Sequence, residues 1–177
     1  MGVRHSTRQT ETDAAAEVDL AEVYVAHYRQ MVGLAAFLLG SALEAEDVVQ
    51  DAFVKLAGRR LNDPDNAVAY LRRTVVNACK DTARRRTVAD KHARTLTVPR
   101  PGAGADELAE PAFDRAELVV ALRKLSPRRR QVVVLRHYCD LGEAAVAELL
   151  GISVGAVKSL ASRGLAELAQ TMEARDE

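Results

Sequence analysis

A row of basic and amide side chains recurs at helical spacing in the middle of the chain. Arg73, Asn77, Lys80 and Arg84 follow one another at steps of four, three and four residues, so a helix would align them on one face. The same face is broadened by three further basic residues, Arg72, Arg85 and Arg86. Guanidinium and ammonium groups bind phosphates, and the Asn77 amide carries both a donor and an acceptor for the edge of a base. This row predicts contact with nucleic acid, although a solvated charged face is the alternative.

A second pattern, near the C-terminus, is typical of a helix-turn-helix. Ala147 is small where two helices would touch, Gly151 can adopt the left-handed conformation that ends a helix, and Ser153 can cap the next one. The outward side of that next helix carries small and basic residues, namely Gly155, Lys158, Ser159, Ser162 and Arg163. Such a helix can approach a DNA groove closely and bind phosphates or base edges. An ordinary pair of capped helices remains the alternative.

A third surface is acidic. Glu46, Asp47, Gln50 and Asp51 lie opposite an apolar stripe of the same expected helix. The pairs 46 with 50 and 47 with 51 have helical spacing. The sequence therefore predicts either a docking surface for a basic partner helix or a solvated acidic face near a helix N-terminus.

Apolar periodicity and capping residues predict an all-α chain of two small helical domains joined by a flexible linker. The expected helices span about 20–39, 41–57, 67–86, 113–125, 127–138, 143–150 and 154–172. Ser41 and Glu44 have the spacing of a capping box, and Ser126 precedes a proline at a helix start. Residues 87–112 lack periodicity and carry a Pro-Arg-Pro-Gly segment, which predicts the linker.

Charge is segregated along the chain although the formal net charge is zero. Nine acidic residues and one basic residue lie between Glu11 and Asp51, whereas eight basic and two acidic residues lie between Arg72 and Arg94. Separate acidic and basic surfaces suggest two kinds of partner.

Other classes of protein fit the sequence poorly. The only two cysteines, Cys79 and Cys139, lack metal-site spacing and are expected to be buried. We find no metal cluster, no Gly-rich phosphate loop and no nucleophile–base pattern, so we expect neither an enzyme nor a cofactor. The longest apolar run, from Met31 to Leu39, is too short to cross a bilayer, so we expect a soluble, cytoplasmic protein without membrane insertion.

Four segments together resemble the extracytoplasmic-function (ECF) sigma factors of the sigma-70 family. They are AEDVVQDAFVKL at 45–56, AYLRRTVVN at 69–77 with Arg84, Arg85 and Arg86 after it, LSPRRRQVVVLR at 125–136, and GISVGAVKS at 151–159. Their order and separations make the resemblance specific. It covers residues 20–86 and 113–168, and it implies an alternative sigma factor that binds bacterial core RNA polymerase, recognises the −35 and −10 promoter elements and promotes DNA melting.

The resemblance also implies a role for each surface. The acidic residues Glu46, Asp47, Gln50 and Asp51 would dock on the clamp helices of the polymerase β′ subunit. The basic row would hold the −10 element as a single strand, through Arg72, Arg73, Asn77, Lys80, Arg84, Arg85 and Arg86. The helix-turn-helix would read the −35 element and pack on the β flap, with DNA contacts from Ser153, Gly155, Ala156, Lys158, Ser159, Ser162 and Arg163.

The implied organisation is a flexible tail at 1–17, sigma region 2 at 18–86, a linker at 87–112 and sigma region 4 at 113–177. Promoter DNA and core polymerase are the expected partners, and the resemblance leaves room for an anti-sigma factor. A simple helix-turn-helix regulator that acts without polymerase is the alternative. It would explain the last segment but would leave the acidic helix and the basic row without a role.

Overall fold

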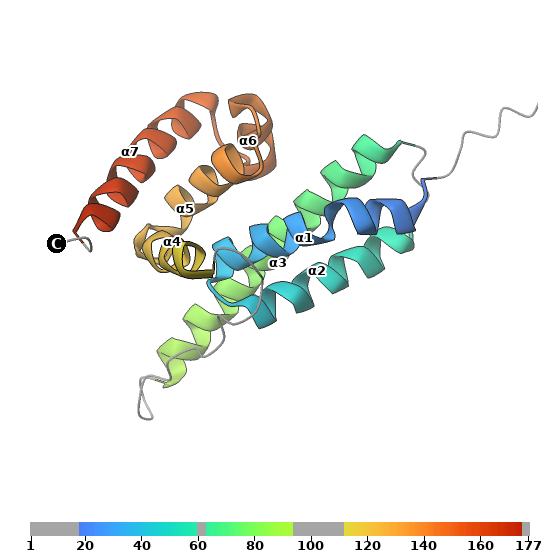
Figure 1. Ribbon diagram of the computed structural model, residues 1–177, viewed down its shortest axis with the longest axis horizontal. Coiled ribbons are helices and arrows are strands. Elements are labelled where there is room, and N and C mark those ends of the chain that lie inside the picture. Colours follow the sequence, from blue (N-terminus) through green and yellow to red (C-terminus); the bar gives the residue numbers. More distant parts are fainter. Residues whose placement is uncertain (1–17, 60–62, 94–111, 175–177) are drawn as a thin grey trace, which may run out of the picture.

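The computed structural model describes residues 18–59, 63–93 and 112–174, and every regular element in those ranges is helical. The first half contains α1 (Leu20–Leu39), α2 (Ala42–Ala57) and α3 (Pro64–Ala93). The second half contains α4 (Ala112–Lys124), α5 (Pro127–Val133), the π-helical turn η1 (Val134–Tyr138), α6 (Glu143–Leu150) and α7 (Val154–Glu173). Figure 1 shows the two halves side by side, and the all-α prediction is confirmed. The expected tail at 1–17 and residues 94–111 of the expected linker lie outside the described ranges.

The first half is a three-helix unit. Both faces of α1's C-terminal half are buried, from Met31 to Leu39, because α2 and α3 pack on it from one side and the second half packs on it from the other. Leu71 and Val75 of α3 and Val49 of α2 are fully buried against α1. The apolar run of the sequence is therefore the central helix of the core.

Local capping explains where the first helices begin and end. Asp19, which the sequence pattern did not single out, caps α1 by accepting from the Ala21 N–H at 2.8 Å. Gly40 ends α1 in the left-handed conformation, with φ of 71°. Ser41 Oγ accepts from the Glu44 N–H at 3.4 Å, which is one half of the expected capping box. The other half is absent because the Glu44 carboxylate turns to Arg86 instead.

Three expected helix boundaries are wrong. The third helix begins at Pro64 instead of about residue 67. The third helix extends seven residues past Arg86, to Ala93, since neither glycine nor proline interrupts residues 87–93. The expected single helix at 127–138 widens into a π-helical turn after Val133, and the Cys139 N–H bonds to the Val134 carbonyl at 3.2 Å. Ser126 starts α5 as expected, but its side chain makes no capping bond.

The helix-turn-helix prediction is confirmed in its local geometry. Gly151 has φ of 67°, and the Ile152 N–H returns to the Ala147 carbonyl at 3.0 Å, which closes α6. Ser153 Oγ then caps α7 by accepting from the Ala156 N–H at 3.2 Å. The direction of the chain changes by 102° between α6 and α7. A turn of this size lets α7 project its first residues outward.

Val157, Ala161, Leu165 and Leu168 recur at helical spacing and predict the buried face of α7, and one of them differs in the structure. Leu165 is 39% exposed, and the buried neighbour is Gly164, which lies against α5. A Cβ atom at Gly164 would stand 2.6 Å from Val133 Cγ2 and 3.4 Å from Arg129 Cβ. The glycine thus allows α5 and α7 to approach closely.

Gly164→Ala is therefore expected to lower the free energy of unfolding of the second half by about 1–3 kcal/mol, because Val133 must move. Urea unfolding followed by circular dichroism measures the effect. Gly155→Ala is the matched control, since its Cβ would meet only Ser153 Oγ at 4.0 Å. An equal loss in both variants would show that close packing at Gly164 is not the cause.

Candidate nucleic-acid interface

The basic row lies on the outer side of α3, but its members differ in solvent exposure. Arg73, Asn77, Arg84 and Arg85 are exposed. Arg72, Lys80 and Arg86 are half-buried. Burial lowers the pKa of Lys80, and the nearby charges of Arg128 and Arg73 lower it further. Arg73, Asn77 and Arg84 share one helical face and Arg85 lies beside it, and these exposed residues are the ones available to a phosphate backbone.

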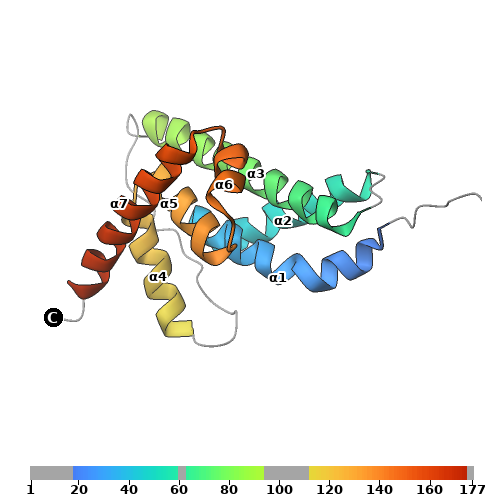
Figure 2. The same ribbon diagram turned by 90° about the horizontal axis from the view of Figure 1, so that it is seen from above.

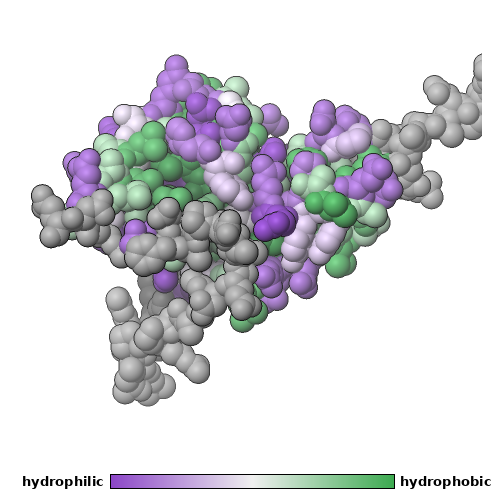
Figure 3. All heavy atoms as spheres, in the orientation of Figure 1, coloured by the Kyte–Doolittle hydropathy of each residue, from purple (hydrophilic) through white to green (hydrophobic). Residues whose placement is uncertain are grey.

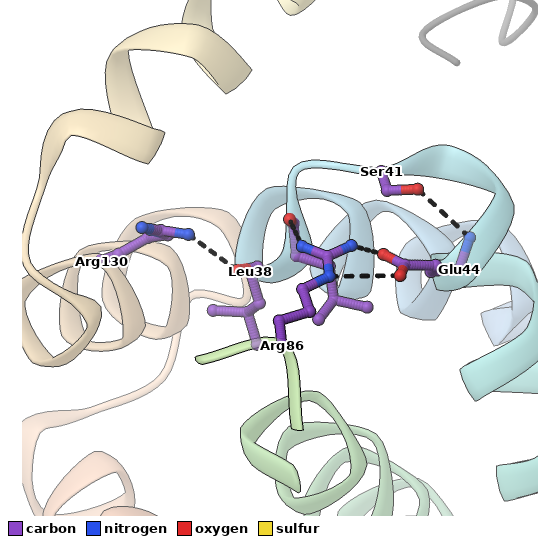
Figure 4. Close-up of polar contacts among 6 residues, drawn as sticks. Leu38, Ser41, Glu44, Arg86 and Arg130 are labelled. Carbon is purple, nitrogen blue, oxygen red and sulfur yellow. Dashed lines mark hydrogen bonds and ion pairs between the residues drawn. The ribbon is translucent and has the colours of Figure 1, made fainter. Parts of the chain in front are cut away.

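Arg86 occupies a different environment from the rest of the row. Its Nη1 donates to the Leu39 carbonyl at 2.9 Å, and its guanidinium also forms an ion pair with Glu44 (Figure 4). The last carbonyls of α1 have no partner within that helix, so a cation there is favourable. Arg86 consequently joins α3 to α1 and α2, and a DNA contact by Arg86 would compete with these bonds.

An aromatic side chain extends the row towards the start of α3. Tyr70 is half-buried, and the Arg59 guanidinium carbon lies 4.4 Å from the centre of its ring. This distance is typical of a cation–π contact. Sequence reasoning missed Arg59, because nothing in its local pattern indicates that it folds back over α3.

The acidic surface of α2 is mostly exposed to solvent. Asp47, Gln50 and Asp51 are exposed, whereas Glu46 is half-buried beside Tyr28. Burial raises the pKa of Tyr28, and a hydrogen bond with the Gln50 side chain opposes that rise. Tyr28 stacks on Tyr24 with ring centres 4.6 Å apart.

Two apolar residues on α2 were not singled out from the sequence. Leu43 is 69% exposed and Val54 is 72% exposed. They stand four residues before Asp47 and four residues after Gln50, so helical spacing places them at the two ends of the acidic stripe. The spacing of four residues from Asp47 and Gln50 is the sequence signal that could have identified these two residues.

Apolar surface occurs on both halves of the molecule. Figure 3 shows green areas over each half, with purple hydrophilic residues between them. Among the described residues, the large exposed apolar side chains are Tyr24, Val25, Leu43, Val54 and Val88 in the first half and Val120, Val154, Leu165 and Met172 in the second.

The start of α7 presents the third surface. Its expected DNA-contacting residues are exposed, apart from the half-buried Ala156; they are Ser153, Gly155, Lys158, Ser159, Ser162 and Arg163. Lys158 Nζ lies 3.6 Å from a carboxylate oxygen of Glu143 on α6. An exposed pair of this kind contributes little to stability, so Lys158 can exchange Glu143 for a phosphate.

Both cysteines are free and buried, as expected. Burial raises the pKa of Cys79 to about 12 and that of Cys139 to about 11. Within the described ranges, no group of three or more His, Cys, Asp or Glu residues could hold a metal ion. No single helix in the same ranges is long and apolar enough to cross a membrane; only α6 and α7 taken together, with the bend between them, pass by length and composition.

Comparison with known proteins identifies the class. The Sigma-70 region 2 family matches residues 23–88, and the Sigma-70 region 4 family matches residues 115–168. The chain is therefore a two-region member of the sigma-70 family. A regulator consisting of a helix-turn-helix alone is not favoured, because region 2 also matches.

Individual relatives narrow the class further. The chain is 37% identical to the RNA polymerase sigma-E factor of Streptomyces avermitilis over 141 residues, which is 78% of this chain and 76% of that protein. It is 31% identical to the ECF RNA polymerase sigma factor SigM of Mycobacterium tuberculosis over 160 residues, covering 85% and 76% of the two proteins. The chain belongs to the ECF sigma factors, and it is an alternative sigma factor for transcription initiation.

Solved structures of this family share the fold. The sigma factor RpoE of Bartonella quintana, in complex with the anti-sigma factor NepR, matches with a TM-score of 0.69 at 20% identity, covering 88% of this chain and 97% of that chain. CnrH, in complex with the cytosolic domain of CnrY, matches with a TM-score of 0.62 at 25% identity, covering 88% of each chain.

Proposed function

We propose that three separate surfaces of this sigma factor carry out polymerase docking, −10 binding and −35 recognition. The exposed acidic stripe of α2, at Asp47, Gln50 and Asp51, docks on the β′ clamp helices of core RNA polymerase. Glu46 contributes at the edge of that stripe, where it is half-buried. The exposed basic face of α3 holds the −10 strand, and the start of α7 reads the −35 duplex while the second half packs on the β flap.

The observation that carries the proposal is the separation of opposite charges onto neighbouring helices. The carboxylates of Asp47 and Asp51 project from α2, and the guanidinium groups of Arg73 and Arg84 project from α3. A basic protein helix binds an acidic surface, whereas a nucleic acid strand binds a basic surface, and this chain has one of each.

Opening of the −10 region follows from the chemistry of α3. Extruding a base from the duplex costs a few kcal/mol, which a preformed site must offset. Tyr70 offers a ring for stacking, Asn77 offers an amide for a base edge, and Arg73 offers a charge for the backbone. Of the remaining basic residues, Arg72, Lys80, Arg84 and Arg85 extend the track, and Arg86 reaches it only by leaving Glu44.

The boundaries of the functional units are part of the proposal. Region 2 spans 18–86 and region 4 spans 113–177, with a tail at 1–17 and a linker at 87–112, whose first seven residues continue α3. The chain works in the cytoplasm with core polymerase, without a cofactor and without catalysis of its own. An anti-sigma factor is a further partner, by analogy with the solved complexes of RpoE and CnrH.

Run-off transcription tests the proposal. Purified bacterial core polymerase is mixed with a pool of genomic promoter fragments, with and without the chain. We expect discrete transcripts that require the chain and that share a bipartite promoter motif. Specific binding of duplex DNA by the chain without any effect of polymerase would contradict the proposal.

A further inference from the structure

The first turn of α7 lies at an exposed corner of the second half. The helix begins at Val154, directly after the turn at which the chain changes direction by 102°. Figure 2 shows α7 running from this turn towards the C-terminus at the edge of the molecule. Ser153, Val154 and Gly155 are all exposed there. When such a helix lies in a major groove, its first residues are the ones that reach the edges of the bases.

Val154 is an apolar residue on this exposed turn. It is 41% exposed, whereas Val157, three residues later, is fully buried and supplies the contact between α7 and the core. Val154 stands four residues before Lys158, so the two side chains lie on the same side of the helix. The Val154 methyl groups are therefore placed beside a phosphate-binding side chain and are available to a molecule outside the chain.

Gly155 has no packing role within the chain. A Cβ atom at this position would meet only Ser153 Oγ within 4 Å, at 4.0 Å. At Gly164 of the same helix, by contrast, a Cβ atom would stand 2.6 Å from Val133 Cγ2. Glycine destabilises a helix relative to alanine, so we infer that the missing side chain of Gly155 leaves room for a surface outside the chain.

This turn offers few hydrogen-bonding side chains to a base. Ser153 Oγ is engaged as the cap of α7, where it accepts from the Ala156 N–H at 3.2 Å. The three residues 154–156 carry no polar side-chain atoms. Arg163 lies nine residues after Val154, which is about 13.5 Å along the helix axis, so the two side chains face different base pairs. The first turn therefore presents mainly methyl groups to the groove.

The matching apolar feature of a base edge is the C5 methyl group of thymine, because the other groups in the major groove are hydrogen-bond donors and acceptors. We propose that Val154 determines part of the −35 specificity by packing its methyl groups on the C5 methyl group of a thymine, and that Gly155 lets the turn approach that base pair. The proposal rests on the proposed role of α7 in −35 recognition. It requires an A·T base pair in the −35 element, opposite Val154.

Replacement of thymine by uracil in the DNA tests the contact. This change removes only the C5 methyl group and keeps the base pair and its hydrogen-bonding groups. Each thymine of the −35 element is replaced singly, in a duplex promoter found by run-off transcription. Binding of core polymerase with the full chain is measured by competition fluorescence anisotropy. We expect uracil at one position to weaken binding about fourfold, which is the effect of one buried methyl group.

Val154→Ala completes the comparison from the protein side. Val154 is exposed and alanine favours a helix, so the fold should be retained. We expect this variant to bind the thymine promoter about fourfold more weakly than the unsubstituted chain. Uracil at the sensitive position should then cause no further loss, because the methyl group has already lost its partner.

Val120→Ala is the matched control, because Val120 is 43% exposed and lies on α4. This variant should respond to uracil as strongly as the unsubstituted chain does. Any change in polymerase affinity applies to both DNAs and cancels in the ratio of the thymine and uracil affinities.

Gly155→Ala tests the close approach. The added Cβ atom meets no atom of the chain closer than 4.0 Å, so the helix should form as before. We expect promoter binding to weaken about tenfold, because the new methyl group must be accommodated against the base pair. Undiminished binding would overturn the close approach at Gly155.

Three results would overturn the thymine contact. They are a −35 element without an A·T base pair, the absence of any position at which uracil weakens binding, and an equal loss with uracil in Val154→Ala and in the unsubstituted chain. The proposed function fails in a different way. If an unrelated sequence in place of the whole −35 element binds equally well, the role of α7 in −35 recognition is wrong, and the thymine contact falls with it.

Discussion

The double substitution Asp47→Lys with Asp51→Lys is expected to lower the affinity for core polymerase by about 100-fold or more and to remove run-off transcripts. Both side chains are exposed on one face of α2, so the substitutions should not disturb the core. Placing like charges against a basic partner helix costs several kcal/mol, and each 1.4 kcal/mol is about a tenfold change in affinity. Polymerase binding is measured by fluorescence polarisation of the labelled chain in the absence of DNA.

The control for this variant changes the same number of charges elsewhere. Glu22→Lys with Glu173→Lys alters two exposed acidic residues on α1 and α7. If the control lost as much affinity as the α2 variant, net charge and not the acidic stripe would determine binding. Unchanged binding of the α2 variant would show that α2 is not the docking helix.

Asn77→Ala is expected to lower transcription from a cognate promoter by about 10- to 100-fold while polymerase affinity changes less than about twofold. A polar group that loses its hydrogen-bond partner in a water-poor interface costs about 1–3 kcal/mol, which corresponds to this range. Asn77 is exposed between Arg73 and Arg84 on α3, so its amide is free to contact a base edge. Initiation rates and polymerase binding are measured on the same preparations.

Gln170→Ala serves as the comparison, because it removes an exposed amide from a helix that the proposal does not place near the −10 strand. It should leave transcription unchanged. Equal losses of polymerase affinity and transcription in Asn77→Ala would assign the residue to polymerase binding and refute the base contact.

Much of the fold could be predicted because its signals are local. Gly151 ends α6 in the left-handed conformation, and Ser41 and Ser153 cap α2 and α7, as their types and positions indicated. Apolar periodicity located all the helical segments. Such signals depend on a few neighbouring residues, so they can be recognised without knowledge of the tertiary contacts.

The incorrect predictions concern features that are determined by tertiary contacts. Glu44 completes a capping box by sequence, yet it pairs with Arg86, which is 42 residues away. Gly164 replaces Leu165 as the buried residue because α5 approaches α7 at that point. The π-helical turn before Cys139 had no sequence signal either.

In the candidate site, too, local features could be predicted from the sequence and long-range contacts could not. Helical spacing was sufficient to place Arg73, Asn77 and Arg84 on one face of α3. It could not show that Arg59 covers Tyr70 or that α6 lies beside Arg72. Contacts between segments far apart in the sequence require the three-dimensional structure.

Permanganate footprinting of a promoter tests most directly whether this chain opens DNA through α3. The reagent oxidises unpaired thymines, so it reports melting at each position. With core polymerase and the chain, thymines in the −10 region should become reactive, and Asn77→Ala should reduce that reactivity while the −35 contacts remain. Two results would contradict the assignment of strand opening to α3. One is that the thymines stay unreactive in a polymerase complex that still makes transcripts, and the other is equal thymine reactivity in the Asn77→Ala complex.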